Sequence, residues 1–178
     1  MIALGVDVGK RTGIALLDCA FPRPRRILSE AVDGEALAGR LAVLLADHDV
    51  AIVGIETPTQ VFAHGRAREG MDARIGIERA LLAAAPMIGV VRAVVELQRP
   101  AATVHEAQAH AVRRAVIGRL PRAGVDRHIA NLLPHLVDGW PIRSNDHERD
   151  AAVVALWVSR RRAPLPVMPR MPARRRSR

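Results

Sequence analysis

The segment 2–18 constrains this chain most, because it places a carboxylic acid inside an otherwise apolar strand. Two apolar runs flank a tight turn, which predicts a β-hairpin. Alternation along the first run puts Asp7 on the same face as Ala3 and Gly5, whose small size leaves room beside the carboxylate. A charge at such a position costs several kcal/mol unless it is paired or coordinated. We therefore interpret Asp7 as a ligand for a metal ion or a phosphate-bound metal, with a turn-capping carboxylate as the alternative.

The turn between the two runs contains Lys10 and Arg11 and is bordered by Gly9 and Gly13. Glycine at such positions permits a positive φ or a close approach by another backbone segment. We expect one or both of these roles for the two glycines.

Hydrophobic periodicity over the rest of the chain predicts an α/β domain with a mixed central sheet flanked by helices. The first three strands should be antiparallel, and a helical crossover should lead to a parallel fourth strand. We expect strands at 2–7, 12–18, 26–32, 50–55 and 102–105; helices at 35–48, 71–85, 106–117, 123–133 and from 145 or 146 to about 159; a turn at 33–34; a loop at 57–70; and a helix break or restart at Pro86.

The positive charge is concentrated at the C-terminal end. The net charge is +9, yet residues 159–178 contain eight arginines and no acid, so the remainder carries only about one positive charge. We expect one domain over 1–159 and a disordered Arg/Pro-rich tail over 160–178. Such a tail suits nucleic acid better than a membrane surface, because it lacks an amphipathic period.

Cysteine content and hydropathy indicate the compartment. Cys19 is the single cysteine, which excludes an internal disulfide and suits a reducing cytoplasm. The early apolar run is interrupted by Asp7, so no signal peptide is expected. The longest apolar run, 80–91, contains Pro86 and is too short to span a bilayer. We expect a cytoplasmic protein with no membrane contact.

Acids occur in three apolar segments that are far apart in the sequence. Glu56 follows the buried run 50–55, and the last expected helix opens with Asp146, His147 and Asp150 before a fully apolar stretch. Spacings of three and four put these first-turn groups near one helix face. Converging carboxylates repel one another unless a divalent cation joins them, so the segments together indicate a metal site. For the helix alone, an N-terminal cap with an acid at the positive dipole end is an adequate explanation.

These residues resemble a family. The chain is similar to the RuvC-type Holliday junction resolvases of the RNase H-like superfamily over most of 2–158. The resemblance rests on four blocks: Leu4-Gly5-Val6-Asp7-Val8-Gly9; Ile55-Glu56; Val104-His105-Glu106 followed by Val112-Arg113 and Gly118; and His147-x-x-Asp150-Ala151.

The resemblance implies an RNase H-like fold, a homodimer, and paired nicking of four-way DNA junctions in recombination or repair. It implies two Mg²⁺ ions per active site, with Mn²⁺ as a substitute, held by the catalytic set Asp7, Glu56, His147 and Asp150. The expected DNA contacts are Arg66, Arg68, Arg113, Arg114 and Phe62. The chain departs from the family pattern at Val8, where the family has proline, and at Thr59, where it has a base-contacting aromatic residue. Phe62 either takes that role or is an ordinary core residue.

Two other functions compete with this interpretation. The opening Asp7-Val8-Gly9-Lys10-Arg11-Thr12-Gly13 resembles the Asp-x-Gly-x-Lys-Arg-x-Gly motif of the RuvX (YqgF) branch of the superfamily, which is implicated in ribosomal RNA processing but lacks the block at 104–118. It also resembles the phosphate turn of actin-like ATPases, whose two lobes need more residues than this chain has. A catalytically inactive nucleic-acid-binding module is a further alternative, although the retained acids argue against it.

The region 71–97 is also expected to form a dimer interface. It carries more apolar surface than one small sheet can cover, and a two-fold dimer matches the symmetry of a four-way junction. The alternative is that these helices simply pack on their own sheet.

Overall fold

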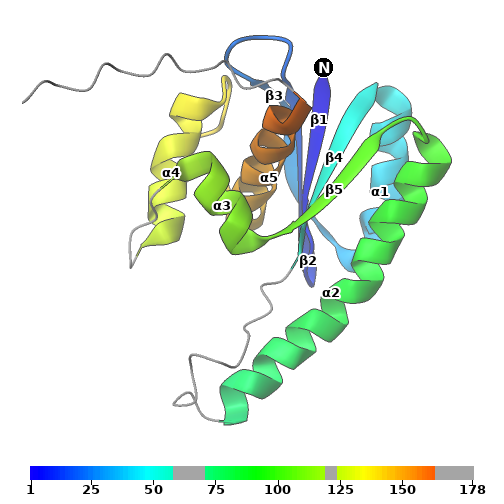
Figure 1. Cartoon of the computed structure of the whole chain (residues 1–178), viewed down its shortest axis with the longest axis vertical. Coiled ribbons are helices and arrows are strands. Elements are labelled where there is room, and N and C mark those ends of the chain that lie inside the picture. The colour runs from blue at the N-terminus through cyan, green and yellow to red at the C-terminus, as the bar shows by residue number, and fades with distance from the viewer. Residues whose placement is uncertain (58–70, 119–123, 163–178) are drawn as a thin grey trace, which may run out of the picture.

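The computed structural model describes residues 1–57, 71–118 and 124–162; for residues 71–81, 83 and 162 only the backbone is described. Within these residues the helices and strands follow one another along the chain as in Figure 1. Their bounds are β1 Ile2–Asp7, β2 Arg11–Asp18, β3 Arg25–Asp33, α1 Gly34–Asp47, β4 Val50–Thr57, α2 Met71–Gln98, β5 Thr103–Gln108, α3 Ala109–Ile117, α4 Val125–Leu136 and α5 Asp146–Arg162.

The strands form one mixed sheet in the order β3-β2-β1-β4-β5. β1, β2 and β3 pair antiparallel, whereas β4 runs parallel to both β1 and β5. This confirms the expected antiparallel meander followed by a crossover to a parallel strand. Because the crossover returns β4 to the far side of β1, the first strand lies in the middle of the sheet.

Helices cover both faces of the sheet (Figure 1). One apolar cluster joins α3, α4 and α5 to the face that carries Ala3, Ala15 and Ile52. A second cluster joins α1 and α2 to the face that carries Leu4 and Val6. The alternation expected for the first strand is therefore confirmed, with each set of side chains entering its own core.

α5 is the central helix of the first cluster, and it lies unusually close to the sheet. Every residue from Ala151 to Ser159 is buried. A Cβ added at Gly5 would lie 2.0 Å from the Ala151 carbonyl oxygen, and one added at Gly54 would lie 2.6 Å from the Val158 side chain. Gly5 and Gly54 are register partners on neighbouring strands, so they make a side-chain-free strip across β1 and β4 on which α5 rests. The small residues before Asp7 thus accommodate a helix; the expected open space beside the carboxylate is not there.

Gly13 provides a similar close approach at the other end of this face. A Cβ at Gly13 would lie 2.0 Å from the His147 carbonyl oxygen, in the first turn of α5. The expected close backbone approach is therefore confirmed at Gly13. The expected positive φ is not found at Gly9 or Gly13, because the positive-φ glycines among the described residues are Gly118, Gly124 and Gly139.

Two boundaries differ from the sequence prediction because pairing and chain direction override local preference. β5 extends to Gln108, where the sequence predicted a helix from 106, since Ala107 and Gln108 pair with β4. At 33–34 the chain passes straight from β3 into α1, with Asp33 as an extended N-cap residue, so the predicted turn is wrong.

Pro86 neither breaks nor restarts a helix, because α2 runs continuously from Met71 to Gln98. Pro86 is exposed, so the carbonyl group that proline leaves without a donor can be satisfied by water. Two other helices extend beyond their predicted ends, α4 to Leu136 and α5 to Arg162. The predicted tail beyond Arg162 and the loop 58–70 lie outside the described residues.

Gly13→Ala is expected to lower the free energy of unfolding by about 3 kcal/mol, because neither the β2 backbone nor the first turn of α5 can move aside cheaply. The matched control is Gly39→Ala in α1, where an added Cβ has no atom within 4 Å. The control should be neutral or stabilising by up to about 1 kcal/mol, through helix propensity. Urea unfolding followed by circular dichroism measures both, and equal effects would contradict the close packing of α5.

Candidate active site

Two of the candidate acids lie side by side on the sheet. Asp7 ends β1, Glu56 is the next-to-last residue of β4, and the two are direct partners in the parallel register. Partners in register point to the same face of a sheet, here the face that α5 covers. The fold therefore brings together two carboxylates that lie 49 positions apart in the sequence.

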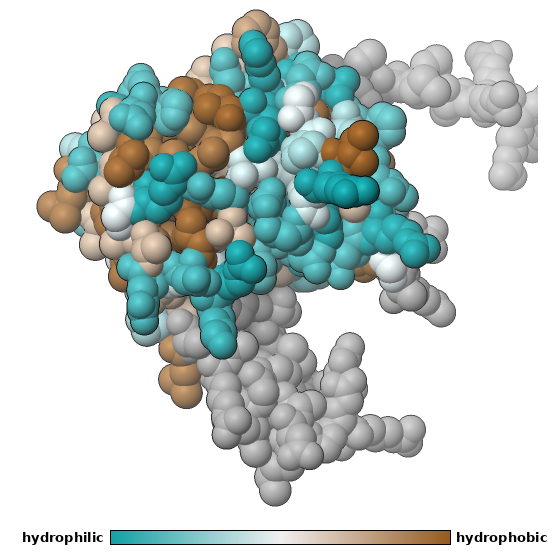
Figure 2. Space-filling view, turned by 180° about the vertical axis from the view of Figure 1, so that it is seen from behind, coloured by the Kyte–Doolittle hydropathy of each residue, from teal (hydrophilic) through white to brown (hydrophobic). Residues whose placement is uncertain are grey.

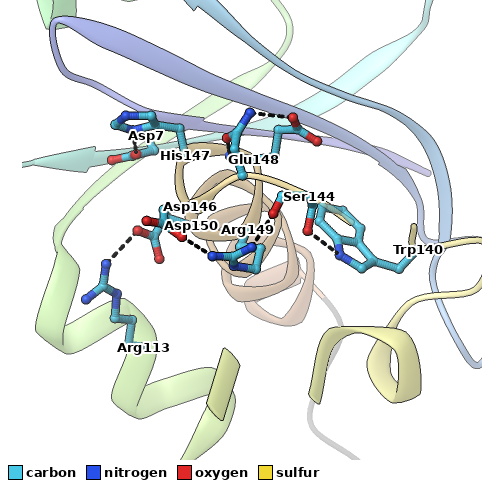
Figure 3. A network of polar contacts seen from close by, with 10 residues as sticks. Asp7, Arg113, Trp140, Ser144, Asp146, His147, Glu148, Arg149 and Asp150 are labelled. Atoms are coloured by element: carbon cyan, nitrogen blue, oxygen red, sulfur yellow. Dashed lines mark hydrogen bonds and ion pairs between the residues drawn. The ribbon is translucent and has the colours of Figure 1, made fainter. Parts of the chain in front are cut away.

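The first turn of α5 adds the imidazole of His147. Its Nδ1 lies 3.0 Å from Oδ2 of Asp7, and Figure 3 shows the two side chains facing one another. In the tautomer in which Nδ1 carries the proton, His147 donates this hydrogen bond and Nε2 keeps a free lone pair. The ring is 43% exposed, whereas the Asp7 side chain is only 15% exposed, so the histidine lies at the solvent side of the pair.

Asp150 follows one turn later on α5 and is paired with Arg113 of α3. An Arg113 guanidinium nitrogen donates a hydrogen bond of 2.6 Å to Oδ2 of Asp150, and the two side chains are 23% and 13% exposed. Figure 3 shows Arg113 reaching from α3 toward the end of the helix that carries the acids. The Arg113 Nε atom is buried and has no hydrogen-bond partner among the described residues.

Burial and mutual repulsion dominate the electrostatics at Glu56. Burial, together with the charges of Asp7 and Asp150, raises the pKa of Glu56 to about 8, and the charge of Arg113 opposes them in part. The side chain is 6% exposed, and its Oε2 atom has no hydrogen-bond partner among the described residues. Such an orphaned acceptor in a desolvated site is costly unless something else binds it.

Asp7 and Asp150 experience the same opposing effects. Burial raises the pKa of Asp7, although the hydrogen bond from His147 and the charge of Arg113 lower it in part. Burial also raises the pKa of Asp150, and Arg113 is again the main opposing influence. All three carboxyl groups therefore have a raised pKa, which is typical of functional sites.

The charges and ligand atoms of these side chains suit a divalent metal ion better than they suit direct contact with one another. Carboxylate oxygens and one imidazole nitrogen suit Mg²⁺ or Mn²⁺, and a cation would satisfy the orphaned Glu56 oxygen and remove the repulsion. In the arrangement described, Asp150 faces Arg113 and His147 faces Asp7. No three acidic, histidine or cysteine side chains among the described residues are yet close enough together to hold one ion.

A polar anchor that the sequence analysis missed fixes the first turn of α5. Glu148 accepts a 3.0 Å hydrogen bond from Ser29 of β3, and its backbone N–H donates to the Asn145 side chain at 2.9 Å. The signal was the spacing of Asn145 and Glu148, which is that of a capping box. Asn145 is thus the residue whose side chain caps the helix.

Other candidate residues fall outside this centre. Asp146 points away from it to pair with Arg149 and is 66% exposed, so only two of the three first-turn groups converge with Asp7. Arg114 is exposed on α3. Arg66, Arg68, Thr59 and Phe62 lie outside the described residues.

In the presence of a chelator, Glu56→Gln should stabilise the protein in a pH-dependent way. The folded-state pKa of about 8 lies above the usual 4.5, so the folded state binds more protons between these values and wild-type stability falls as pH rises through them. The glutamine variant lacks this loss, and its advantage should grow from near zero at low pH to roughly 2 kcal/mol at high pH. Urea unfolding across this pH range tests it, with exposed Glu96→Gln as control; an advantage independent of pH would contradict the prediction.

Comparison with known proteins gives similarity in structure but not in sequence. No protein-family model matches the chain, and no curated protein sequence matches it either. Thermus thermophilus RuvC aligns over 88% of this chain and 92% of its own, with 17% identity and a TM-score of 0.61. The same protein in complex with a Holliday junction substrate aligns over the same shares, with 15% identity and a TM-score of 0.68. The yeast mitochondrial Holliday junction resolvase Ydc2 covers 88% of this chain and 77% of its own, with 10% identity and a TM-score of 0.58.

These alignments span 88% of the chain, and they match a sheet of order 3-2-1-4-5 with helices on both faces. At such low identity they establish the fold and leave the activity open. The chain has the RNase H-like fold found in RuvC and other Holliday junction resolvases, as its sequence motifs indicated.

Proposed function

We propose that this protein is a metal-dependent, structure-selective DNA endonuclease that nicks four-way junctions during recombination or repair. The observation that carries the proposal is the set of buried acids Asp7, Glu56 and Asp150, with His147 hydrogen-bonded to Asp7, in a fold shared with Holliday junction resolvases. A binding module for phosphates would gain nothing from three desolvated carboxyl groups with raised pKa values. We assign this activity to the cytoplasm.

Asp7, Glu56, His147 and Asp150 would hold the metal. Two Mg²⁺ or Mn²⁺ ions, when bound, supply activation of the attacking water and charge neutralisation at the departing oxygen. Asp7 is the register partner of Glu56 and is hydrogen-bonded to His147, which supports the proposal that it would contribute to both ions. The nitrogen ligand from His147 favours Mn²⁺ over Mg²⁺.

The protein supplies orientation and exclusion of water. The Asp7–His147 hydrogen bond fixes the imidazole ring and directs its free nitrogen away from the strand. The anchor of Glu148 on Ser29 keeps the first turn of α5 over the sheet, so that His147 and Asp150 stay near Asp7. The surrounding protein that buries Glu56 excludes water and lowers the local dielectric, which strengthens charge interactions at this centre.

We assign DNA binding to basic residues of α3, to the segment that contains Arg66 and Arg68, and to the tail. Arg113 and Arg114 on α3, with Arg66 and Arg68, are the candidate phosphate contacts, and Phe62 is the candidate base contact. Residues 163–178 contain five arginines and no acid, so this part of the tail adds affinity by counterion release without sequence or structure preference.

We further propose that two copies assemble through α1 and α2. Val43 on α1 and Leu82 and Leu97 on α2 are 48%, 75% and 81% exposed. Figure 2 shows apolar side chains gathered at the end of the molecule formed by these helices, opposite the more polar end. Apolar surface of this kind suits a two-fold interface, and two active sites match two strands to be nicked.

Asp7→Asn and Asp150→Asn are expected to abolish nicking of a synthetic four-way junction in Mg²⁺ or Mn²⁺, by at least about 100-fold, while gel-shift binding of the junction survives. The control is Asp146→Asn, an exposed acid in the same helical turn that pairs with Arg149 and should leave nicking unchanged. The same assay should include flap, duplex and RNA substrates.

Each outcome of that assay discriminates between functions. Full nicking by Asp7→Asn would contradict the metal-site assignment, whereas loss of both nicking and binding would indicate a structural role for the acids. Cleavage of RNA in preference to junctions would favour the RuvX-like alternative, whose motif includes the exposed basic turn at Lys10 and Arg11.

Leu82→Lys should convert the proposed dimer to a monomer, because a charge on an exposed apolar patch must be desolvated when the interface forms. The control is Ile142→Lys, which is equally apolar and 95% exposed but lies in the connection between α4 and α5. Light scattering measures the mass of each variant. A monomeric wild-type protein at concentrations well above those needed for nicking would overturn the dimer.

A further inference from the structure

Arg113 is the cation that the fold inserts into the acidic centre. It donates to Asp150 at 2.6 Å, and its charge acts on Asp7, Glu56 and Asp150 alike. The neighbouring residue Arg114 is exposed on the same helix, so α3 places Arg113 inside the centre and Arg114 outside it.

A count of charges shows why this arrangement matters. When all three carboxyl groups are ionised, as metal ligands are, they and one guanidinium leave two negative charges, which one divalent cation would balance. A second divalent cation would leave two positive charges; departure of Arg113 would reduce them to one, which a DNA phosphate could balance. Arg113 and a metal ion near Asp150 therefore compete for the same negative charge.

The geometry indicates that the Arg113 side chain can move away from Asp150. Its side chain is 23% exposed, and its buried Nε atom has no hydrogen-bond partner among the described residues, so the guanidinium is held mainly through Asp150. The charge of Asp126, at the start of α4, also acts on Arg113. Loss of the Asp150 partner would leave a partly exposed guanidinium available for an anion.

Building on the proposed function, we propose that Arg113 serves as the cation beside Asp150 until a metal ion binds there and displaces it. In the metal-free protein it neutralises Asp150; when a divalent cation binds at Asp150, Arg113 is released to contact a DNA phosphate. Arg113 is thus a positioning residue that couples metal binding to DNA binding, in addition to its expected phosphate contact.

The first test measures Mn²⁺ affinity without DNA, by electron paramagnetic resonance of free Mn²⁺ or by calorimetry. Arg113→Met keeps the aliphatic stem, removes the charge and should bind Mn²⁺ about tenfold more tightly, which lies within the usual range of coupling between sites. Arg114→Met should bind as wild type does, and Arg113→Lys, which keeps the charge, should lie near wild type.

The second test measures the salt dependence of junction binding, in EDTA and in Ca²⁺, with fluorescence anisotropy. Arg113→Met should leave the slope of log K against log salt unchanged in EDTA and lower its magnitude by about 0.9 in Ca²⁺. Arg114→Met should change the slope equally in both, because its availability does not depend on metal.

The outcomes separate this inference from the proposed function. If neither wild type nor Arg113→Met binds Mn²⁺, the metal site and the inference both fail. If wild type binds Mn²⁺ and Arg113→Met binds it equally or more weakly, only the exchange role of Arg113 is overturned. Arg113→Gln, which keeps hydrogen-bonding capacity without charge, replaces the methionine variant if circular dichroism shows that the latter does not fold.

Discussion

The structure depends on the close approach of the α5 backbone to the central strands. Gly5 and Gly54 form a strip without side chains, and Gly13 extends it beneath the first turn of the helix. Two register positions beyond Gly5 and Gly54 lie Asp7 and Glu56. Because the helix can sit this low only over glycine, the same packing that closes the core sets His147 beside Asp7.

The packing of α5 on the sheet creates a buried acidic centre, and ionising the carboxyl groups there is electrostatically unfavourable. Burial is the largest cause of the raised pKa at each of the three carboxyl groups, and Arg113 offsets it in part. Because one Glu56 oxygen has no hydrogen-bond partner, the described side chains do not satisfy every polar atom of the site. A protein selected for stability alone would place apolar residues here, so the buried acids agree with the metal-binding role proposed for this centre.

Local pattern was sufficient for the parts of the molecule whose neighbours are close in sequence. The hairpin around Lys10, the α1 helix and the buried strand β4 agree with their predicted ranges to within one or two residues. Prediction failed where the surroundings of a segment in the fold decided the outcome. Pairing with β4 extends β5 through Gln108, and exposure of α2 to solvent lets Pro86 remain within a continuous helix. The anchor between Glu148 and Ser29 was missed because these residues lie 119 positions apart.

By itself, the sequence determined that Asp7, Glu56, His147 and Asp150 should share one site, since alternation, apolar context and motif spacing are properties of the chain. Only the tertiary structure decided which group each one faces. Asp7 contacts His147, Asp150 contacts Arg113, Asp146 turns outward to Arg149, and Glu56 keeps an oxygen without a partner. The physical reason is that side-chain partners across a core depend on strand register and on the height of α5 above the sheet, and both come from packing between segments that are remote in sequence.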